Sequence, residues 1–519
     1  MILHIAKKDF LLNLISARFF IGFLLCLLII PFTVVVNVEN YLSQVQVYKV
    51  EKEKAEKEFN EVRVWSFLRP TVVREPAVLS IFSNGISNNV GYSQRIHLGE
   101  YPLFPSQQVI ANDNPFLNTF SSIDFFRVIS ILISLIALVF SYDAITRERE
   151  DGTMRLTLTG EVSRITFLFG KLTGLLLTLL PILLFCYILA CLIVMVNPEI
   201  GLSAKDWGSI VLLFLTSIVY MLVFILIGMF ISALVSRSST SIILSLLCWI
   251  WFLFLVPNIS SYLAKNIVKT PLWVNVYSIL KEFDDEYWDI MNEVRDKIAK
   301  ELNLEDLNYW TKIDGGDGNY EIRGITKEMA LYHQQLSIWE FSALQDYADK
   351  KWQYQKKYLD DLVYQQRCQQ RISMLSPSEI FKQSTSSLCR TDMQSFLKYW
   401  ESIRNYRETF FRYYTDKKIF ESFSYFLIEQ FEDLLEEKDL VDFEEIDDDE
   451  FERLLEEWEE SSAWMDSAFL DLDDVPRHVS KITLSTVIKD AMGKLTMLFG
   501  LMVVLLMATV VAFMRYDVR

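Results

Sequence analysis

Long apolar runs separated by wetted stretches dominate the pattern of the chain. A helix needs about 20 apolar residues to cross a hydrocarbon core of ~30 Å, because each residue rises only ~1.5 Å. None of the runs carries a charged side chain at its middle, where one would cost roughly 2.5–3.5 kcal/mol. The pattern predicts an all-α membrane protein with six transmembrane helices, at 19–38, 123–146, 172–196, 210–235, 241–256 and 491–514.

Basic residues in the short loops predict the orientation of these spans. Lys and Arg are enriched in cytoplasmic loops of membrane proteins. With six spans, all of the basic short segments fall on one side, which we expect to be the cytoplasm together with both termini. The segments are the N-terminus, the loop 147–171, the inner turn 236–240 and the tail 515–519. The regions 39–122, 197–209 and 257–490 then face outward.

The first 18 residues have the pattern of a helix lying in the membrane interface. Ile2, Ile5, Phe10 and Leu14 fall near one helical face, and the lysines at 7 and 8 point away from it. The span that follows is too long and lacks the small-residue site of a cleaved secretory signal, so we interpret it as an uncleaved anchor.

Three glycines lie within the predicted spans at positions where helices could meet. In lipid, small residues let two helix backbones approach closely. Gly174, Gly228 and Gly500 are therefore candidates for close contacts between helices; the alternative is that they are isolated glycines of the kind common in membrane helices.

The outer region 257–490 is long enough to form a mainly helical domain. Aromatic residues recur at helical spacing from Trp339 to Trp352 and again from Phe396 to Tyr413. We interpret them as packed core rather than as a groove for an apolar substrate. Ser376, followed by Pro377 and Glu379, predicts the start of a helix. Asp314–Asn319 predicts a turn.

The other outer stretches have distinct patterns. A charged helix is expected to continue out of the first span over 48–62, followed by short strands and turns up to residue 122. The acidic stretch 431–460 keeps apolar residues at helical intervals, which predicts a solvated amphipathic helix pair. A calcium loop is the alternative, but the spaced ligands and the glycine of such a loop are missing.

Composition argues against several other classes of function. The net charge is −17, and much of the acidic charge lies in the regions expected to face outward. An acidic chain of this kind gives no reason to expect nucleic-acid binding. The four histidines lack metal-ligand spacing, so we expect no metal site. Gly170-Lys171 lacks the earlier glycine of a phosphate loop, so this chain should not hydrolyse ATP by itself. Cys368 and Cys389 are the two outer cysteines, which either pair in an oxidising compartment or remain free thiols.

The loop 147–171 contains three short motifs just before the third span. They are, in this order, Glu150-x-Gly152-Thr153, Val162-Ser163-Arg164 and Gly170-Lys171. With these motifs the loop resembles the corresponding loop of ABC-2 type ABC transporter permeases. Glu161 stands where the family usually has proline. The segments 74–85 and 376–414 are also similar to a subgroup loosely described as multi-copper enzyme maturation permeases, from which we carry over no copper.

The resemblance implies a non-catalytic permease subunit in a bacterial cytoplasmic membrane that exports a substrate or transmits force to an outer domain. The spans show no buried charged site, which favours an amphipathic, lipid-like or peptide-like substrate over small ions. ATP and Mg would be bound by a cytosolic ABC ATP-binding subunit, and the permease would work as a homodimer or as a heterodimer with a related permease. The loop would be a coupling helix that docks on the ATP-binding subunit. The residues implied in this contact are Glu148, Glu150, Gly152, Thr153, Arg164 and Lys171. The alternative is a membrane-anchored outer scaffold or receptor that binds a partner protein without transport.

Overall fold

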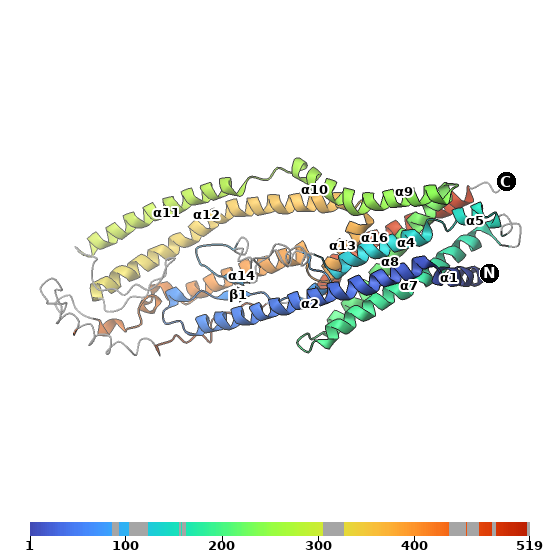
Figure 1. The fold of residues 1–519 in the computed structure, drawn as a ribbon. Coiled ribbons are helices and arrows are strands. Elements are labelled where there is room, and N and C mark those ends of the chain that lie inside the picture. The colour runs from blue at the N-terminus through green and yellow to red at the C-terminus, as the bar shows by residue number, and fades with distance from the viewer. Residues whose placement is uncertain are drawn as a thin grey trace.

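The molecule is an elongated assembly of helices, with a compact bundle at one end and long helices extending from it (Figure 1). The computed structural model describes residues 1–85, 93–102, 123–154, 157, 162–304, 326–434, 453, 467–479 and 484–515. The N-terminal helix α1 (Ile2–Leu14) and the last described turn of the chain lie at the same end of the bundle (Figure 1). The mainly helical architecture confirms the predicted fold class.

Six helices in the described part of the chain are long and apolar enough to cross a membrane, which confirms the predicted number of spans. The second span, α4, is followed at once by the short helix α5. The fifth span is one continuous helix made of α9, the π-helical turn η4 and α10. The elements are α2 (Ala17–Asn60), α4 (Phe125–Ser141), α5 (Thr146–Glu150), α7 (Arg164–Val196), α8 (Ala204–Leu234), α9 (Ser238–Ile250), η4 (Trp251–Leu255), α10 (Val256–Ile267) and α16 (Leu484–Met514).

The third and fourth span helices begin before the apolar runs that predicted them. The Ser163 hydroxyl caps α7 by accepting from the backbone N–H of Thr166 at 3.1 Å. Ser203 and Asp206 form a reciprocal capping box at the start of α8. The predicted loop 147–171 is therefore shorter than expected, because Arg164 and Lys171 already belong to α7. The first turns of these helices are partly polar, so a prediction from apolar run length leaves them out although their backbone is helical.

Long helices also form most of the described chain outside the bundle of spans, in the regions that the sequence predicts to face outward. α2 runs far beyond the first span, as the charged helix predicted over 48–62 requires, and is followed by a two-stranded antiparallel sheet that confirms the predicted short strands. The remaining outer elements are β1 (Thr71–Val73), β2 (Ser93–Arg95), α11 (Trp273–Glu301), α12 (Lys327–Ser373), α13 (Pro377–Leu388) and α14 (Met393–Asp416). Single 3₁₀ turns lie at Trp65–Phe67, Val78–Ile81, Ile419–Glu421, Phe423–Tyr425 and Phe431–Asp433.

The aromatic stripe of α14 is core, as predicted. Phe396, Trp400, Ile403 and Phe410 are all buried in one apolar cluster with residues of the α2 end and of β1. On α12, Phe341 stacks on the ring of Phe411 with the ring centroids 4.6 Å apart. These contacts fasten α12 and α14 together.

One expectation for the region 257–490 needs correction. α13 starts at Pro377 behind the Ser376 cap, as predicted, but it packs against α4, α8 and α16 rather than within the outer domain. Cys368 and Cys389 are both free thiols in the structure. Cys389 is buried in the core cluster that the spans form. Most of the acidic stretch 431–460 and the predicted turn Asp314–Asn319 lie outside the described residues.

Candidate functional site: the loop at the terminal end of the bundle

The turn between α4 and α5 is fixed to two other spans by hydroxyl groups. The Ser232 hydroxyl near the end of α8 accepts hydrogen bonds from the backbone N–H of Ile145 at 3.1 Å and of Thr146 at 3.0 Å. From α9, the Ser241 hydroxyl donates to the carbonyl of Tyr142 at 2.6 Å. Backbone groups left open between the end of α4 and the start of α5 are thus satisfied, and α5 has a fixed place at this end of the bundle.

Lys171 joins three elements in a buried ionic cluster. Its Nζ lies 2.8 Å from Glu148 Oε1 on α5 and 3.1 Å from Asp9 Oδ1 on α1. The side chains of Lys171, Asp9 and Glu148 are only 9%, 11% and 14% exposed. Burial raises the pKa of Asp9, and the ammonium of Lys171 opposes this shift. A buried lysine that keeps its charge needs such partners, so the cluster holds α1, α5 and α7 together.

Two glycines let α1 approach α7 closely. A Cβ atom at Gly170 would lie 2.8 Å from Cβ of Ile5, and one at Gly174 would lie 3.0 Å from Cβ of Asp9. The side-chain amide of Asn13 donates to the Thr178 hydroxyl at 3.5 Å. Residue numbers thus rise together along the contact, so α1 and α7 run in the same direction. Gly174 is thereby confirmed as a close helix contact.

The other two glycines singled out from the sequence differ. Gly228 on α8 lies directly against Ser141 of α4, which confirms a close contact there. A Cβ at Gly500 would meet no described atom within 4 Å, so no close contact of Gly500 is found in the described chain.

The segment after α5 makes a glycine-dependent turn. Gly152 has φ +71°, a backbone conformation that side chains disfavour, and a Cβ there would meet no atom within 4 Å. The Thr153 hydroxyl donates a hydrogen bond to Glu148 of the buried cluster, so the turn is joined to that cluster. Arg147 and Asp151 form a loose ion pair on the water-facing side, with side chains 70% and 60% exposed.

Glu150 and Arg164 contact other spans. The carboxylate of Glu150 accepts from the backbone N–H of Ser238 at 2.9 Å and from its hydroxyl at 2.6 Å. These bonds lower the pKa of Glu150 and cap the start of α9. Arg164 donates to the carbonyl of Met514 at 2.8 Å, near the end of α16. Glu148, Thr153 and Lys171 therefore come together, while Glu150 and Arg164 bind separate helix ends.

Several residues of this site were not singled out from the sequence. Asp9 and Ser232 have no local motif, because their partners lie 162 and 86 to 87 positions away along the chain. Arg18 is a third case: its guanidinium lies 2.9 Å from Asp143 and donates to the Tyr142 hydroxyl at 2.8 Å. The sequence offered two signals for this pair. Arg18 lies just before the first apolar run, and Asp143 lies just after the second.

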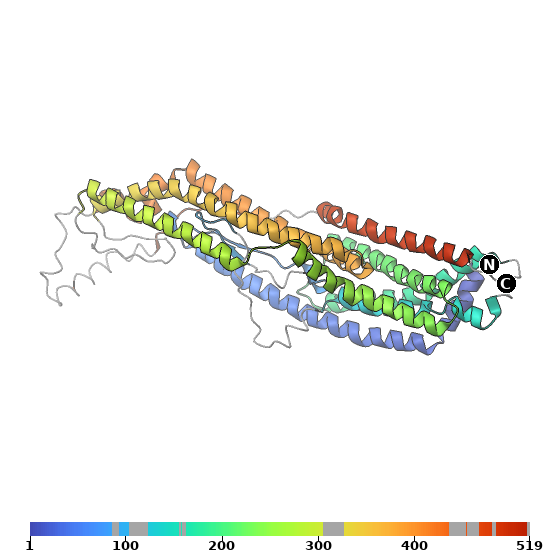
Figure 2. The same ribbon diagram turned by 90° about the horizontal axis from the view of Figure 1, so that it is seen from above.

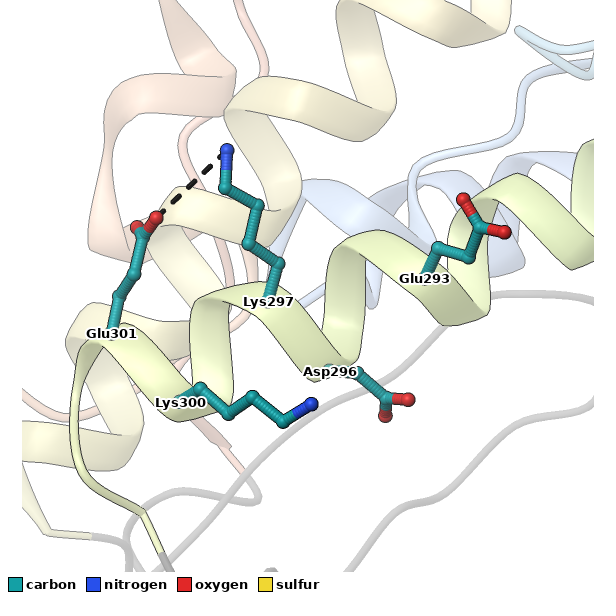
Figure 3. A pocket seen from close by; sticks show the side chains of 5 residues that line it. All are labelled: Glu293, Asp296, Lys297, Lys300 and Glu301. Atoms are coloured by element: carbon teal, nitrogen blue, oxygen red, sulfur yellow. Dashed lines mark ion pairs between the residues drawn. The ribbon is translucent and has the colours of Figure 1, made fainter.

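Other candidate sites are weak. Figure 3 shows a hollow on α11 whose charged side chains leave the helix on opposite sides, with one ion pair of 3.8 Å between Lys297 and Glu301. It is an open stretch of a charged helix surface. In the described part of the chain, no three His, Cys, Asp or Glu side chains gather as a metal site would require.

Comparison with known proteins assigns the family. Residues 3–518 match the model of the ABC-2 family transporter protein. The chain is also similar to the probable ABC transporter permease protein NosY of Stutzerimonas stutzeri, with 33% identity over 130 residues. That stretch is 24% of this chain and 45% of the relative, so the chain spans less than half the length of this curated relative. Since the family model covers almost the whole sequence, the chain belongs to the ABC-2 family of transporter proteins and is a multi-pass membrane protein.

Proposed function

We propose that this chain is the permease subunit of an ATP-driven transporter and that α5 with the Gly152 turn docks on a separate cytosolic ATP-binding subunit. Two copies, or one copy with a related permease, would form the transmembrane unit in a bacterial cytoplasmic membrane. The ATP-binding subunit would carry ATP and Mg. The short loops rich in Lys and Arg support a cytoplasmic position for this end of the bundle.

The observation that carries the proposal is the way the loop is held. Lys171, Glu148 and Asp9 fix the inner side of α5, and Ser232 fixes its first turn. Charged side chains on the other side remain exposed, including Arg147 and Asp151. A rigid element that presents charge to water is suited to docking on a partner of complementary charge.

The contacts also suggest how a partner could act on the spans. α5 is bonded to α1 and α7 through Lys171, to α8 through Ser232 and to α9 through Glu150 and Ser238. A displacement of α5 would therefore reach four other helices at once. If ATP binding favours one position of α5, the difference in binding free energy between the two positions shifts the spans. We propose that this shift extrudes an amphipathic, lipid-like or peptide-like substrate, or moves the outer domain.

Co-expression with the proteins of its genomic neighbourhood tests the proposal. We expect an ATP-binding subunit to copurify and its ATP hydrolysis to be stimulated by the permease. Glu150→Ala and Gly152→Ala should lower this stimulation, because the first releases α9 and the second strains the turn by ~1–2 kcal/mol. Glu199→Ala is the matched control, since Glu199 is an exposed acidic residue outside this site.

Unchanged stimulation in both variants would refute the docking assignment. Purification without any ATP-binding subunit, but with a partner bound to the outer domain, would favour the scaffold or receptor function instead.

A further inference from the structure

α13 is a polar helix buried among apolar spans. Its sequence is rich in Ser and Thr, yet ten of its 12 residues are buried, and it packs against α4, α8 and α16. Figure 1 shows it where the bundle meets the long outer helices. The hydroxyls of Ser384 and Ser386 donate to carbonyls of their own helix at 2.7 and 2.9 Å. Because these polar groups are satisfied internally, the helix can lie inside the bundle.

The first turn of α13 is hydrogen-bonded to an irregular point of the fifth span. The hydroxyls of Ser376 and Ser378 lie 2.6 and 3.0 Å from the carbonyl of Phe252. Phe252 belongs to the π-helical turn η4, where the regular α-helical bonding of the span is interrupted. Such turns are rare and often occur at functional sites. Two directional bonds thus tie α13 to the place where the fifth span is least regular.

The end of α13 and the segment that joins it to α14 are tied to the sixth span by Lys494. Lys494 on α16 lies 3.3 Å from Asp392 and also donates to the Ser387 hydroxyl. The side chains of Lys494 and Asp392 are only 15% and 6% exposed. Asp392 also caps α14 by accepting from the backbone N–H of Ser395 at 3.1 Å. One carboxylate therefore connects α16 with the first turn of the next outer helix.

The middle of α13 is packed by aromatic rings. Phe381 is fully buried and stacks on Tyr220 of α8 with the ring centroids 4.3 Å apart. On its other side it meets Phe126 of α4 edge-to-face at 5.9 Å. α13 is thus in direct contact with the second, fourth, fifth and sixth spans.

α13 also lies between two long outer helices in the chain. α12 has 47 residues, which corresponds to a rod of ~70 Å, and α14 has 24. α12 ends four residues before α13 begins, and α14 begins five residues after it ends. A small tilt of α13 would be enlarged along such rods.

We propose that α13 is the transmission helix that passes movement of the spans to the outer domain, and that Lys494, Ser376 and Ser378 are positioning residues that hold it to the moving spans. This inference rests on the proposed function, since the movement must be driven by the ATP-binding subunit. It adds a specific element and specific bonds that link the two halves of the molecule.

The test measures the outer domain and the ATPase separately, using the full complex in lipid nanodiscs. Spin labels are placed at Lys205 on α8 and Lys356 on α12, both exposed, after the six native cysteines have been replaced by alanine. Distance distributions are recorded without nucleotide and after trapping with ATP and vanadate. The variants are Lys494→Met, Lys494→Arg and the double variant Ser376→Ala/Ser378→Ala. Lys489→Met is the matched control, because Lys489 is an exposed lysine on the same helix.

We expect the distance to change on trapping in the parent and in Lys489→Met. Lys494→Met and the double serine variant should lose this change while stimulated ATP hydrolysis is retained, and Lys494→Arg should restore it. A purely structural role would instead abolish stimulated ATP hydrolysis together with the distance change, which would overturn the inference. So would a parent-like distance change in both Lys494→Met and the double serine variant.

The two proposals fail in different ways. If the parent complex hydrolyses ATP under stimulation but its outer distance does not change, the transmission role is wrong and the permease function stands. If no ATP-binding subunit is bound or stimulated, the proposed function itself is wrong.

Discussion

The two ends of the helix bundle are both held by a buried lysine, but the lysines are used differently. At the terminal end, Lys171 is shared between Asp9 and Glu148, which belong to two further helices. At the opposite end, Lys494 has Asp392 as its carboxylate partner and is completed by the Ser387 hydroxyl. Lys171 therefore holds several helices around one charge. Lys494 instead links one span to the connection between α13 and α14, where Asp392 lies.

The difference extends to the ionisation of the carboxylates. Burial raises the pKa of Asp9, so its charged form is disfavoured in the fold. Burial also acts on Asp392, but Lys494 and the hydrogen bonds from Ser395 and Ser387 lower its pKa overall. The fold therefore stabilises the charged form of Asp392, whereas it disfavours the charged form of Asp9.

Removing the lysines should give the largest effect and should distinguish the two ends. Lys171→Met leaves two buried carboxylates without their cation, so we expect ~3–5 kcal/mol loss of stability. Lys494→Met removes one partner from one carboxylate and should cost less. Melting temperatures in detergent measure both. Lys8→Met is the control, since Lys8 is 63% exposed and 3.8 Å from Glu148. Equal losses for Lys171 and Lys8 would contradict the importance of the buried cluster.

Neutralising the carboxylates should show the opposite preference. Asp392→Asn should lower stability at pH 7 by ~1–3 kcal/mol, because the charged form is the favoured one. Asp9→Asn should have a smaller effect. A folded-state pKa below the usual value also means that the Asp392 contribution is present above pH ~4 and is lost as the pH falls further. A larger loss for Asp9→Asn than for Asp392→Asn, measured by thermal unfolding, would show that the assignment of the two carboxylates is reversed.

The close contact between α1 and α7 predicts a moderate effect. At Gly170 an added methyl group would press on Ile5, so Gly170→Ala should cost ~1–3 kcal/mol and loosen α1. At Gly500 a methyl group would meet nothing within 4 Å in the described chain, so Gly500→Ala should be neutral or slightly stabilising. Protease cleavage within the first 16 residues reports the release of α1. Equal cleavage of the two variants would argue against the contact.

The outer helices supply the smallest predicted effect, which depends on pH. Burial raises the pKa of Glu340 from 4.5 to about 7. The folded chain then keeps a proton that the unfolded chain releases, so stability falls as the pH rises between these two values. Glu340→Gln should remove this dependence and gain stability relative to the parent at pH 8. Glu408→Gln, at an exposed position of α14, should change neither; a flat pH profile in the parent would contradict the raised pKa.

Much of the fold could be predicted from the sequence because it depends on local patterns. Apolar length gave the six spans, and helical spacing of aromatic residues gave the core face of α14. The Ser376 cap also located the start of α13. The position of α13 inside the bundle could not be predicted, because its Ser and Thr residues are typical of a wetted helix unless their internal hydrogen bonds are known.

The structure shows how the residues of the candidate site are held within the chain, and their contact with a partner subunit stays a prediction. The family motif pointed to Glu148, Glu150 and Lys171 as charges for a partner, whereas the structure pairs all three within the chain. Their partners Asp9 and Ser238 are distant in sequence, so no local pattern could reveal them. The exposed charges beside them, Arg147 and Asp151, follow only from the three-dimensional arrangement.

Photo-crosslinking from α5 tests most directly whether this end of the bundle meets the ATP-binding subunit. A photoreactive amino acid replaces Arg147 in the intact complex, and the control replaces Lys205 at the opposite end of the spans. We expect a crosslink to the ATP-binding subunit from position 147 and none from position 205. A complex that crosslinks from 205, or one that remains intact and does not crosslink from 147, would contradict it.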